Sequence, residues 1–150
     1  NEFSMAGGLG SDQAIMNINI DMNATTGGWI FGNDFQLIGG GITGSDGGAD
    51  RLVLNLNVDE SVTNAVANFG NNDVTMAGIS GNDALYANIV AYLRASQSAT
   101  FTSNTFDIGG GTGNDRLVLN MNVNEFVNTG GAQFSILNSA QAGGLTSQVA

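Results

Sequence analysis

Four Gly-x-Asp turns recur at a spacing of 32 to 38 residues, and this repeat constrains the fold more than any other feature of the 150 residues. The four aspartates are separated by 38, 33 and 32 residues, and an asparagine follows each of them five positions later. The aspartates are Asp12, Asp50, Asp83 and Asp115, and the asparagines are Asn17, Asn55, Asn88 and Asn120. A period of this length is typical of proteins that stack one supersecondary unit on the next. We therefore expect residues 1–150 to form a single repeat domain.

The segment after each turn alternates between apolar and polar residues, as a half-buried β-strand does. Residues 52–59 show this pattern, and 10 of the 13 residues in 50–62 recur in 115–127. Residues 84–93 also carry apolar side chains four apart, as a helix would, but their place in the repeat favours a strand. A short apolar segment precedes each turn: 3–5, 35–37, 74–76 and 106–108. The sequence thus predicts two strands per repeat and an all-β fold.

Two all-β architectures accommodate four such units. Alternation over eight or nine residues favours an antiparallel two-sheet sandwich built from four two-strand repeats of about 35 residues. The alternative is a β-solenoid with one repeat per coil. The matching positions of the Asn and Asp residues favour the solenoid, whereas the strand length disfavours it. Our prediction from the sequence is the sandwich.

The turns carry a recognisable motif. Residues 110–118 match the nonapeptide G-G-x-G-x-D-x-U-x in full, and residues 7–15 match it with a weak apolar residue. Residues 78–85 lack the second glycine, and 47–52 are shortened by two. These turns resemble the RTX, or haemolysin-type, calcium-binding repeats of secreted bacterial proteins. The resemblance implies an extracellular location and calcium as cofactor, with five candidate ligands: Asp12, Asp46, Asp50, Asp83 and Asp115.

The spacing of the turns differs from that family, in which nonapeptides follow one another directly. Here one turn occurs every 32 residues or more. A parallel stack would bring the aspartates side by side, and their repulsion would favour a cation between them. In an antiparallel sandwich each aspartate would instead cap its own turn through a hydrogen bond. Both interpretations stay open at the level of sequence.

The composition narrows the function. The net charge of −10 comes from 13 acidic residues against three arginines, which disfavours nucleic acid and makes divalent cations natural partners. The chain has no His, Cys or Lys, so it lacks the groups of a Ser-His or Cys-His dyad and a Lys nucleophile. Glu60 and Glu125 occupy equivalent repeat positions and are interpreted as solvated strand-end charges. No apolar run approaches a membrane span. We predict that the protein is not an enzyme.

Unmatched half-repeats suggest how copies of the chain would associate. Phe134-Ser135-Ile136 is interpreted as a fifth copy of the segment that precedes each turn, and Phe3-Ser4-Met5 is the first copy. These ends can pair between subunits by strand addition. We therefore expect a secreted, extracellular or cell-surface structural subunit that binds copies of itself in a filament, surface layer or matrix. The four asparagines would form a ladder along stacked strands. The alternative function is a calcium-dependent adhesin or an ice- or glycan-binding module.

Overall fold

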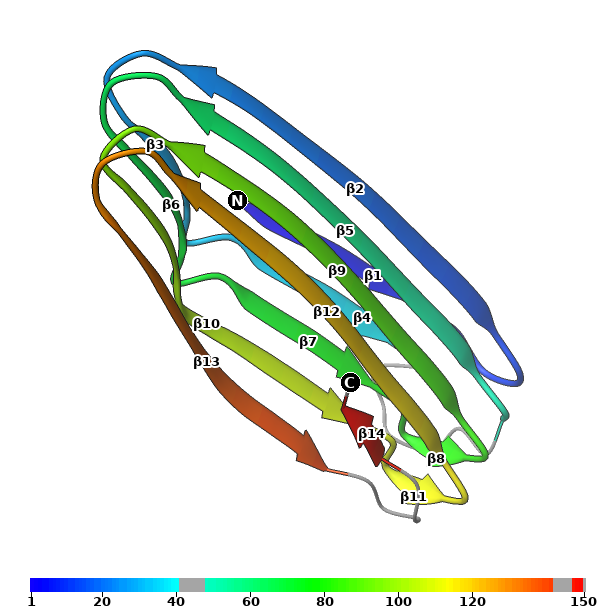
Figure 1. Ribbon diagram of the computed structural model, residues 1–150. Helices are drawn as coiled ribbons and strands as arrows, with labels where there is room; N and C mark the ends of the chain where they lie inside the picture. The colour runs from blue at the N-terminus through cyan, green and yellow to red at the C-terminus, as the bar shows by residue number, and fades with distance from the viewer. Residues whose placement is uncertain (41–47, 142–146, 150) are drawn as a thin grey trace.

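The chain folds into a parallel β-solenoid (Figure 1). The computed structural model describes residues 1–40, 48–141 and 147–149, with the backbone alone beyond residue 131. Every strand pair that it describes is parallel. The predicted antiparallel sandwich is therefore wrong, and the architecture is the alternative weighed against it.

One side of the solenoid is a long sheet of four equal strands. These strands have 12 residues each and pair in the order in which they follow along the chain, with the short β14 at the far edge. They are β2 (Gln13–Ala24), β5 (Arg51–Val62), β9 (Ala84–Ala95) and β12 (Arg116–Val127), followed by β14 (Ser147–Val149). The segment with a helical pattern is the strand β9, so its prediction as a strand is confirmed.

The other side is a second sheet made from two stacks of shorter strands. One stack contains β3 (Gly28–Phe31) and β6 (Val66–Gly70), and the other contains β1 (Glu2–Ala6), β4 (Asp34–Ile38) and β7 (Asp73–Ala77). The strand β10 (Ser98–Gly109) joins the stacks, because its first half pairs with β6 and its second half with β7. β13 (Gly131–Gln141) lies against β10. At the turns, β8 (Ser80–Gly81) pairs with β11 (Thr112–Gly113).

Equivalent residues of successive coils stand directly above one another, which explains why the strands are parallel. Asn55 lies between Asn17 and Asn88 in the register, and Phe35 lies opposite Phe3. Only a parallel, in-register stack places every repeat position on its own copy. The sandwich was predicted from long alternating strands. Alternation of apolar and polar residues shows only that one face of a strand is buried, and it does not show in which direction the neighbouring strand runs.

The two sheets face each other across an apolar core. The long strands contribute Leu52, Leu54 and Leu56 from β5 and their equivalents, and all three are fully buried. The opposite sheet contributes a group of buried aromatic rings: Phe35, Phe69, Phe101 and Phe106. Phe69 and Phe101 stack with ring centroids 5.1 Å apart. Among the described residues no helix has the length and apolar character needed to cross a membrane.

The last coil corrects the predicted alignment of Phe134-Ser135-Ile136. Its register sets Phe134 opposite Phe101 and Ile136 opposite Asn104, whereas the segments that precede the turns align with Phe106-Asp107-Ile108. Residues 134–136 are therefore not a fifth copy of residues 3–5. β13 is also one residue shorter than β10 between these two aligned pairs, because Phe134 and Ile136 are two positions apart whereas Phe101 and Asn104 are three apart.

Candidate functional site

The four predicted aspartates lie in one column at the turns, and each coil is hydrogen-bonded to the next through them. The backbone N–H of Asp12 donates to Oδ1 of Asp50 at 2.8 Å. The N–H of Asp50 donates to Asp83 at 2.8 Å, and that of Asp83 donates to Asp115 at 3.0 Å. Asp50, Asp83 and Asp115 are no more than 4% exposed. Backbone dipoles thus stabilise carboxylates that a stack of bare charges would drive apart.

The second carboxylate oxygen of each aspartate turns back over a glycine of its own turn. Oδ2 of Asp12 accepts a hydrogen bond of 2.7 Å from the N–H of Gly8. A Cβ atom on the glycine at the start of each turn would collide with the carboxylate; these glycines are Gly7, Gly39, Gly78 and Gly110. Each turn therefore needs the aspartate, whose carboxylate folds back over the turn, and the glycine, which leaves space for that carboxylate.

This geometry also corrects the interpretation of the second turn. Three aspartates lie over the glycine five residues before them (12 − 7, 83 − 78 and 115 − 110), whereas Asp50 lies over Gly39, eleven residues before it. The second turn is longer than the others by six residues, rather than shortened by two as its motif indicated. Asp46 belongs to this insertion and lies outside the described residues.

Glycines of the Gly-x-Asp turns form a second column, in which backbone packs directly on backbone. A Cβ at Gly48 would collide with the carbonyl oxygen of Gly10, one at Gly81 with that of Gly48, and one at Gly113 with that of Gly81. Gly81 and Gly113 also have positive φ angles of 130° and 142°. Close approach of the neighbouring coil therefore requires all three glycines, and the turn conformation requires Gly81 and Gly113 as well.

A calcium site at the turns would need more oxygen ligands than the described aspartate side chains bring together in one place. Calcium takes six to eight oxygen ligands. Within residues 1–40, 48–141 and 147–149, no three acidic, His or Cys side chains gather in a way that fits a metal ion. Oδ1 of Asp50, Asp83 and Asp115 already accepts a backbone N–H, whereas Oδ2 of Asp115 has no hydrogen-bond partner among the described residues. The described aspartates form the hydrogen bonds of a capped turn, and calcium at the turns stays a prediction.

The four predicted asparagines form a ladder on the outer face of the long sheet. Asn55 donates from Nδ2 to Oδ1 of Asn17 at 2.7 Å. Asn88 donates to Asn55, and Asn120 to Asn88, each at 2.8 Å. Every amide donates toward the first coil, so the ladder has a direction. A partial second rung runs beside it, in which Asn57 donates to Asn19 at 2.9 Å.

A further asparagine ladder, inside the solenoid, escaped the sequence analysis. Asn33 donates to Asn72 at 2.8 Å, Asn72 donates to Asn104 at 3.0 Å, and all three are at most 7% exposed. Each follows a corner residue with positive φ; these are Gly32, Asn71 and Ser103. The sequence signal was an asparagine one or two residues before the apolar segment that precedes each turn. The sequence does not reveal the backbone corner that turns these side chains inward, so nothing in it distinguishes these asparagines from those on the surface.

Glu60 lies inside the solenoid, contrary to its interpretation as a solvated charge. It is fully buried, and its Oε1 accepts a hydrogen bond of 3.2 Å from the N–H of Asn68, while Oε2 has no hydrogen-bond partner among the described residues. Burial raises the pKa of Glu60 from 4.5 to about 6, and the hydrogen bond opposes this shift. Burial also raises the pKa of Glu125, against a hydrogen bond from the Phe101 backbone. Both carboxyl groups point into the core in place of apolar side chains.

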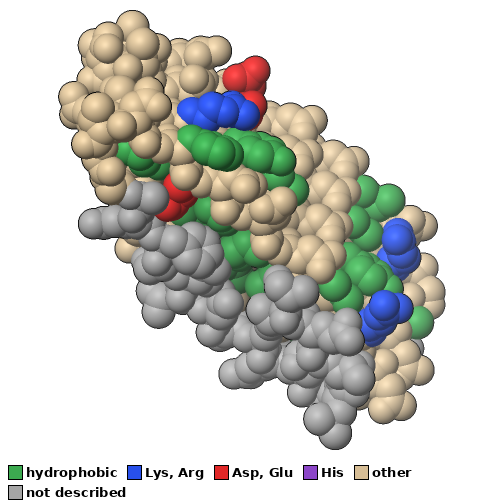
Figure 2. Space-filling view, viewed as in Figure 1, with side chains coloured by type: hydrophobic (Ala, Val, Ile, Leu, Met, Phe, Trp, Pro, Cys, Tyr) green, Lys and Arg blue, Asp and Glu red, His purple; other side chains and the backbone are tan. Residues whose placement is uncertain are grey.

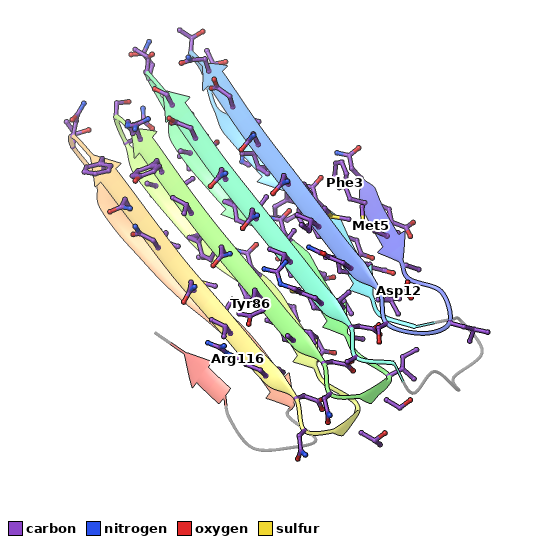
Figure 3. All side chains as sticks on the ribbon, turned by 90° about the vertical axis from the view of Figure 1, so that its right-hand side faces the viewer. Phe3, Met5, Asp12, Tyr86 and Arg116 are labelled. Carbon is purple, nitrogen blue, oxygen red and sulfur yellow. The ribbon has the colours of Figure 1, made fainter. Side chains whose placement is uncertain are left out.

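The first coil leaves apolar groups uncovered, and this open end contains two of the residues predicted to take part in assembly. Phe3 and Met5 are 39% and 38% exposed, whereas Phe35 and Leu37, their equivalents one coil later, are fully buried. Figure 3 shows Phe3 and Met5 on the first strand, at the edge of the stack, with Asp12 at the nearby turn. Of the seven exposed large apolar residues among those whose side chains the structure describes, six lie in this coil: Phe3, Met5, Leu9, Ile15, Trp29 and Phe31.

Comparisons with protein-family models, with curated proteins and with solved structures find no match for this chain. The resemblance to RTX repeats rests on the four turns alone. The functional argument therefore depends on the geometry of the coils.

Proposed function

We propose that the protein is an extracellular structural subunit that self-assembles into a filament, surface layer or matrix through the strand edges at the ends of its coil stack. The open first coil is the observation that supports this most directly. Solenoids require a polar cap at each end to stay soluble as single molecules, yet this end exposes Phe3 and Met5 from the core. Covering them would contribute about 1 kcal/mol each, since full burial of such a side chain is worth about 1.5–3 kcal/mol.

The edge strands at the open end add backbone hydrogen bonds to this apolar contact. β1, β2 and β3 are the first strands of their stacks, so one side of each presents unpaired N–H and C=O groups. Such edges pair with a further parallel strand without any change in the coil. At its other end, a second copy of the same chain offers the edge strands β13, of 11 residues, and β14, of three.

The ladders favour a head-to-tail arrangement of two copies. At the open end the asparagine ladder leaves the Nδ2 donor of Asn17, and at the other end it leaves the Oδ1 acceptor of Asn120. The aspartate column runs the opposite way, with the acceptor on Asp12 and the donor at the Asp115 N–H. Head-to-tail stacking keeps the direction of both series the same from one copy to the next, with the coil of β13 and β14 between them, whereas head-to-head stacking would reverse it. A heterologous contact of this kind does not close and produces filaments.

The register also indicates which strand would receive β1 in such a contact. β1 aligns with β4, β7 and the second half of β10, and β13 continues this stack with residues 137–141. We propose that β1 of one copy pairs with residues 137–141 of the next. This contact replaces the predicted pairing of Phe3 and Met5 with Phe134 and Ile136, because Phe134 aligns with Phe101 in the stack of β3 and β6 rather than in the stack of β1.

Deleting residues 1–6 tests the proposal, with the double variant Phe3→Asp/Met5→Asp as a smaller change. Negative-stain electron microscopy of the purified chain should show filaments that both changes abolish. The matched control is Phe3→Leu/Met5→Leu, which keeps the apolar contact and should keep the filaments. Filaments of normal length from the deleted chain would contradict the proposal, provided circular dichroism shows that the variant is folded.

Calcium-dependent adhesion to ice or a glycan is our second candidate. The parallel stack favours it, because one aspartate per coil recurs at the strand spacing of ~4.8 Å, where a cation would relieve their repulsion. Backbone N–H groups already act on the same carboxylates, which weighs against it. Calorimetric titration with calcium decides: a saturable heat that Asp83→Asn removes would support the candidate, and the absence of any heat would reject it.

A further inference from the structure

The charged side chains are distributed unequally around the solenoid. All three arginines of the chain point outward from the long sheet, where Asp21 and Asp59 are the only acidic residues at outward positions. This face therefore carries a net charge of 3 − 2 = +1 in a chain of net charge −10. Figure 2 shows the basic groups on this face, with acidic surface beside one of them.

Two of these arginines are held in place by one tyrosine. The guanidinium groups of Arg51 and Arg116 each lie over the ring of Tyr86, with Cζ 5.5 Å from its centroid. Tyr86 and Arg116 are neighbours on the outer face in Figure 3. Cation–π contact restrains the guanidinium while leaving its N–H edge free to bind a carboxylate. Neither arginine forms an ion pair with any residue that the structure describes, whereas Arg94 is paired with Asp59.

The opposite side of the molecule carries a column of acids. Glu2, Asp34 and Asp73 are register partners on the outer surface of β1, β4 and β7. Glu2 and Asp73 are exposed, and Asp34 accepts a hydrogen bond from Gln36. Like charges directly opposite each other on a sheet destabilise it. A column of this kind is favourable when a positive surface covers it.

We propose that the Arg51–Tyr86–Arg116 cluster of one copy docks against the Glu2–Asp34–Asp73 column of a second copy, which joins filaments side by side. This inference rests on the proposed self-assembly, because both faces belong to copies of the same chain. Charge complementarity selects the occupant, because the described residues place a basic cluster on one face and an outward-facing column of acids on the opposite face. A lateral contact of this kind converts single filaments into a layer.

The spacing of the two sets of charges supports the match. Arg51 belongs to β5 and Arg116 to β12, with β9 between them, so they are two strand spacings apart, roughly 10 Å. Glu2 and Asp73 are also two strand spacings apart, with Asp34 between them. Two copies with parallel axes therefore bring both arginines to carboxylates at once, because the same strand repeat sets both distances.

Sedimentation velocity tests the contact in a Phe3→Asp/Met5→Asp background, where end-to-end growth is blocked. We expect lateral oligomers at low salt that dissociate at about 0.5 M NaCl, where charges more than a few ångströms apart are screened. Arg51→Gln/Arg116→Gln should weaken this association about tenfold. Arg94→Gln is the matched control, because Arg94 is already paired within its own chain, and it should leave the association unchanged.

A charge exchange gives the decisive arm. Arg51→Glu/Arg116→Glu and Glu2→Arg/Asp73→Arg should each fail to associate alone and should associate when mixed. Failure of the mixture, or association that salt does not weaken, would overturn the proposal. Binding of polygalacturonate to the arginine cluster without self-association would also overturn it, in favour of an acidic polysaccharide. Wild-type filaments that stay single at low salt would reject the lateral contact alone, and lateral pairs without filaments would reject the end-to-end contact alone.

Discussion

The aspartates at the turns and the glutamate in the core are buried to the same degree, yet their surroundings differ. Asp83 is 1% exposed and Glu60 is fully buried. The column of aspartates meets backbone N–H groups of the neighbouring coil, at 2.8 Å from Asp50 to Asp83. Glu60 meets one longer hydrogen bond of 3.2 Å and otherwise apolar side chains, and its pKa is raised to about 6. Hydrogen-bond donors, rather than depth, decide what a buried carboxylate costs.

The largest effect is expected where the turns bring backbone against backbone. Gly81→Ala places a Cβ against the Gly48 carbonyl at a φ of 130°, so the two coils must separate and the aspartate column must stretch. We expect a loss of more than about 3 kcal/mol in the free energy of unfolding, measured by urea denaturation. Gly131→Ala is the control, because a Cβ there meets no atom of the described residues within 4 Å. Equal effects of the two changes would show that close approach at the turns is unimportant.

Removing a carboxylate from the column should have the next largest effect. Asp83→Ala leaves the buried N–H of Asp50 without its acceptor, which costs about 1–3 kcal/mol. Asp83→Asn keeps an acceptor oxygen and should recover part of the loss. Asp21→Ala removes an exposed carboxylate instead and should change the stability by less than about 0.5 kcal/mol. Thermal unfolding followed by circular dichroism would separate the three, and a neutral Asp83→Ala would show that the column is not a stabilising feature.

The core glutamate should behave in the opposite way. Glu60→Gln removes a buried charge, so we expect it to stabilise the protein by about 1–2 kcal/mol at pH 7. Glu2→Gln, at an exposed position, is the matched control and should change the stability little. Chemical denaturation at pH 7 would measure both. A loss of stability in Glu60→Gln, comparable with that of Asp83→Ala, would erase the distinction between the two kinds of carboxylate.

The same comparison predicts a pH dependence with a definite sign. Because the folded-state pKa of Glu60 is raised from 4.5 to about 6, the folded state binds a proton more tightly than the unfolded state. Its contribution to stability is therefore greatest below pH 4.5 and declines by about 2 kcal/mol as the pH rises through 6. Glu125 adds a decline of the same sign. The difference in unfolding free energy between wild type and Glu60→Gln, measured from pH 4 to 7, should follow this curve; a constant difference would contradict it.

We expect the smallest loss of stability from removing asparagine side chains on the outer face. These variants provide a reference for the larger losses expected in the turns and the aspartate column. Asn88 makes two ladder hydrogen bonds, to Asn55 and from Asn120, whereas Asn17 makes one at the end of the ladder. Solvent replaces these bonds readily, so Asn88→Ala should cost about 1 kcal/mol and Asn17→Ala about half of that. Denaturant titrations of both variants would measure this. An order reversed between the two positions would show that the ladder does not act as a series.

The repeat and its strands could be predicted from the sequence, because periodic spacing and alternation can be recognised without knowing which strands pair with each other. The four Asp and four Asn positions, and β9 as a strand, follow from that spacing. The direction of the strands could not be predicted, since a half-buried strand has the same alternation in parallel and antiparallel sheets. Asn-on-Asn and Asp-on-Asp alignment was the better guide, because amide ladders form only in register and each buried Asp accepts the N–H of its equivalent in the neighbouring coil.

Details of the candidate site depended on contacts that a linear pattern does not contain. The position of Glu60 followed from its inward phase in β5, which places it in the same alternating set as Val58 and Val62. The charge of Glu60 favoured an exposed position, but the alternation of β5 places its side chain in the core. The internal asparagines needed the corner angles of Gly32, Asn71 and Ser103, which only the backbone reveals. The six-residue insertion before Asp50 became visible once its carboxylate was found over Gly39.

That insertion also indicates where such a chain tolerates changes in length. Each strand contributes to several columns at once, so losing one residue within β5 would move Asn55 and every later position onto the wrong face. Residues added between Gly39 and Asp50 leave both in their columns, as the close contact of the two shows. Insertions and deletions should therefore gather at the turns in related chains. At those turns new segments can be displayed along one edge of the solenoid without altering its rise per coil.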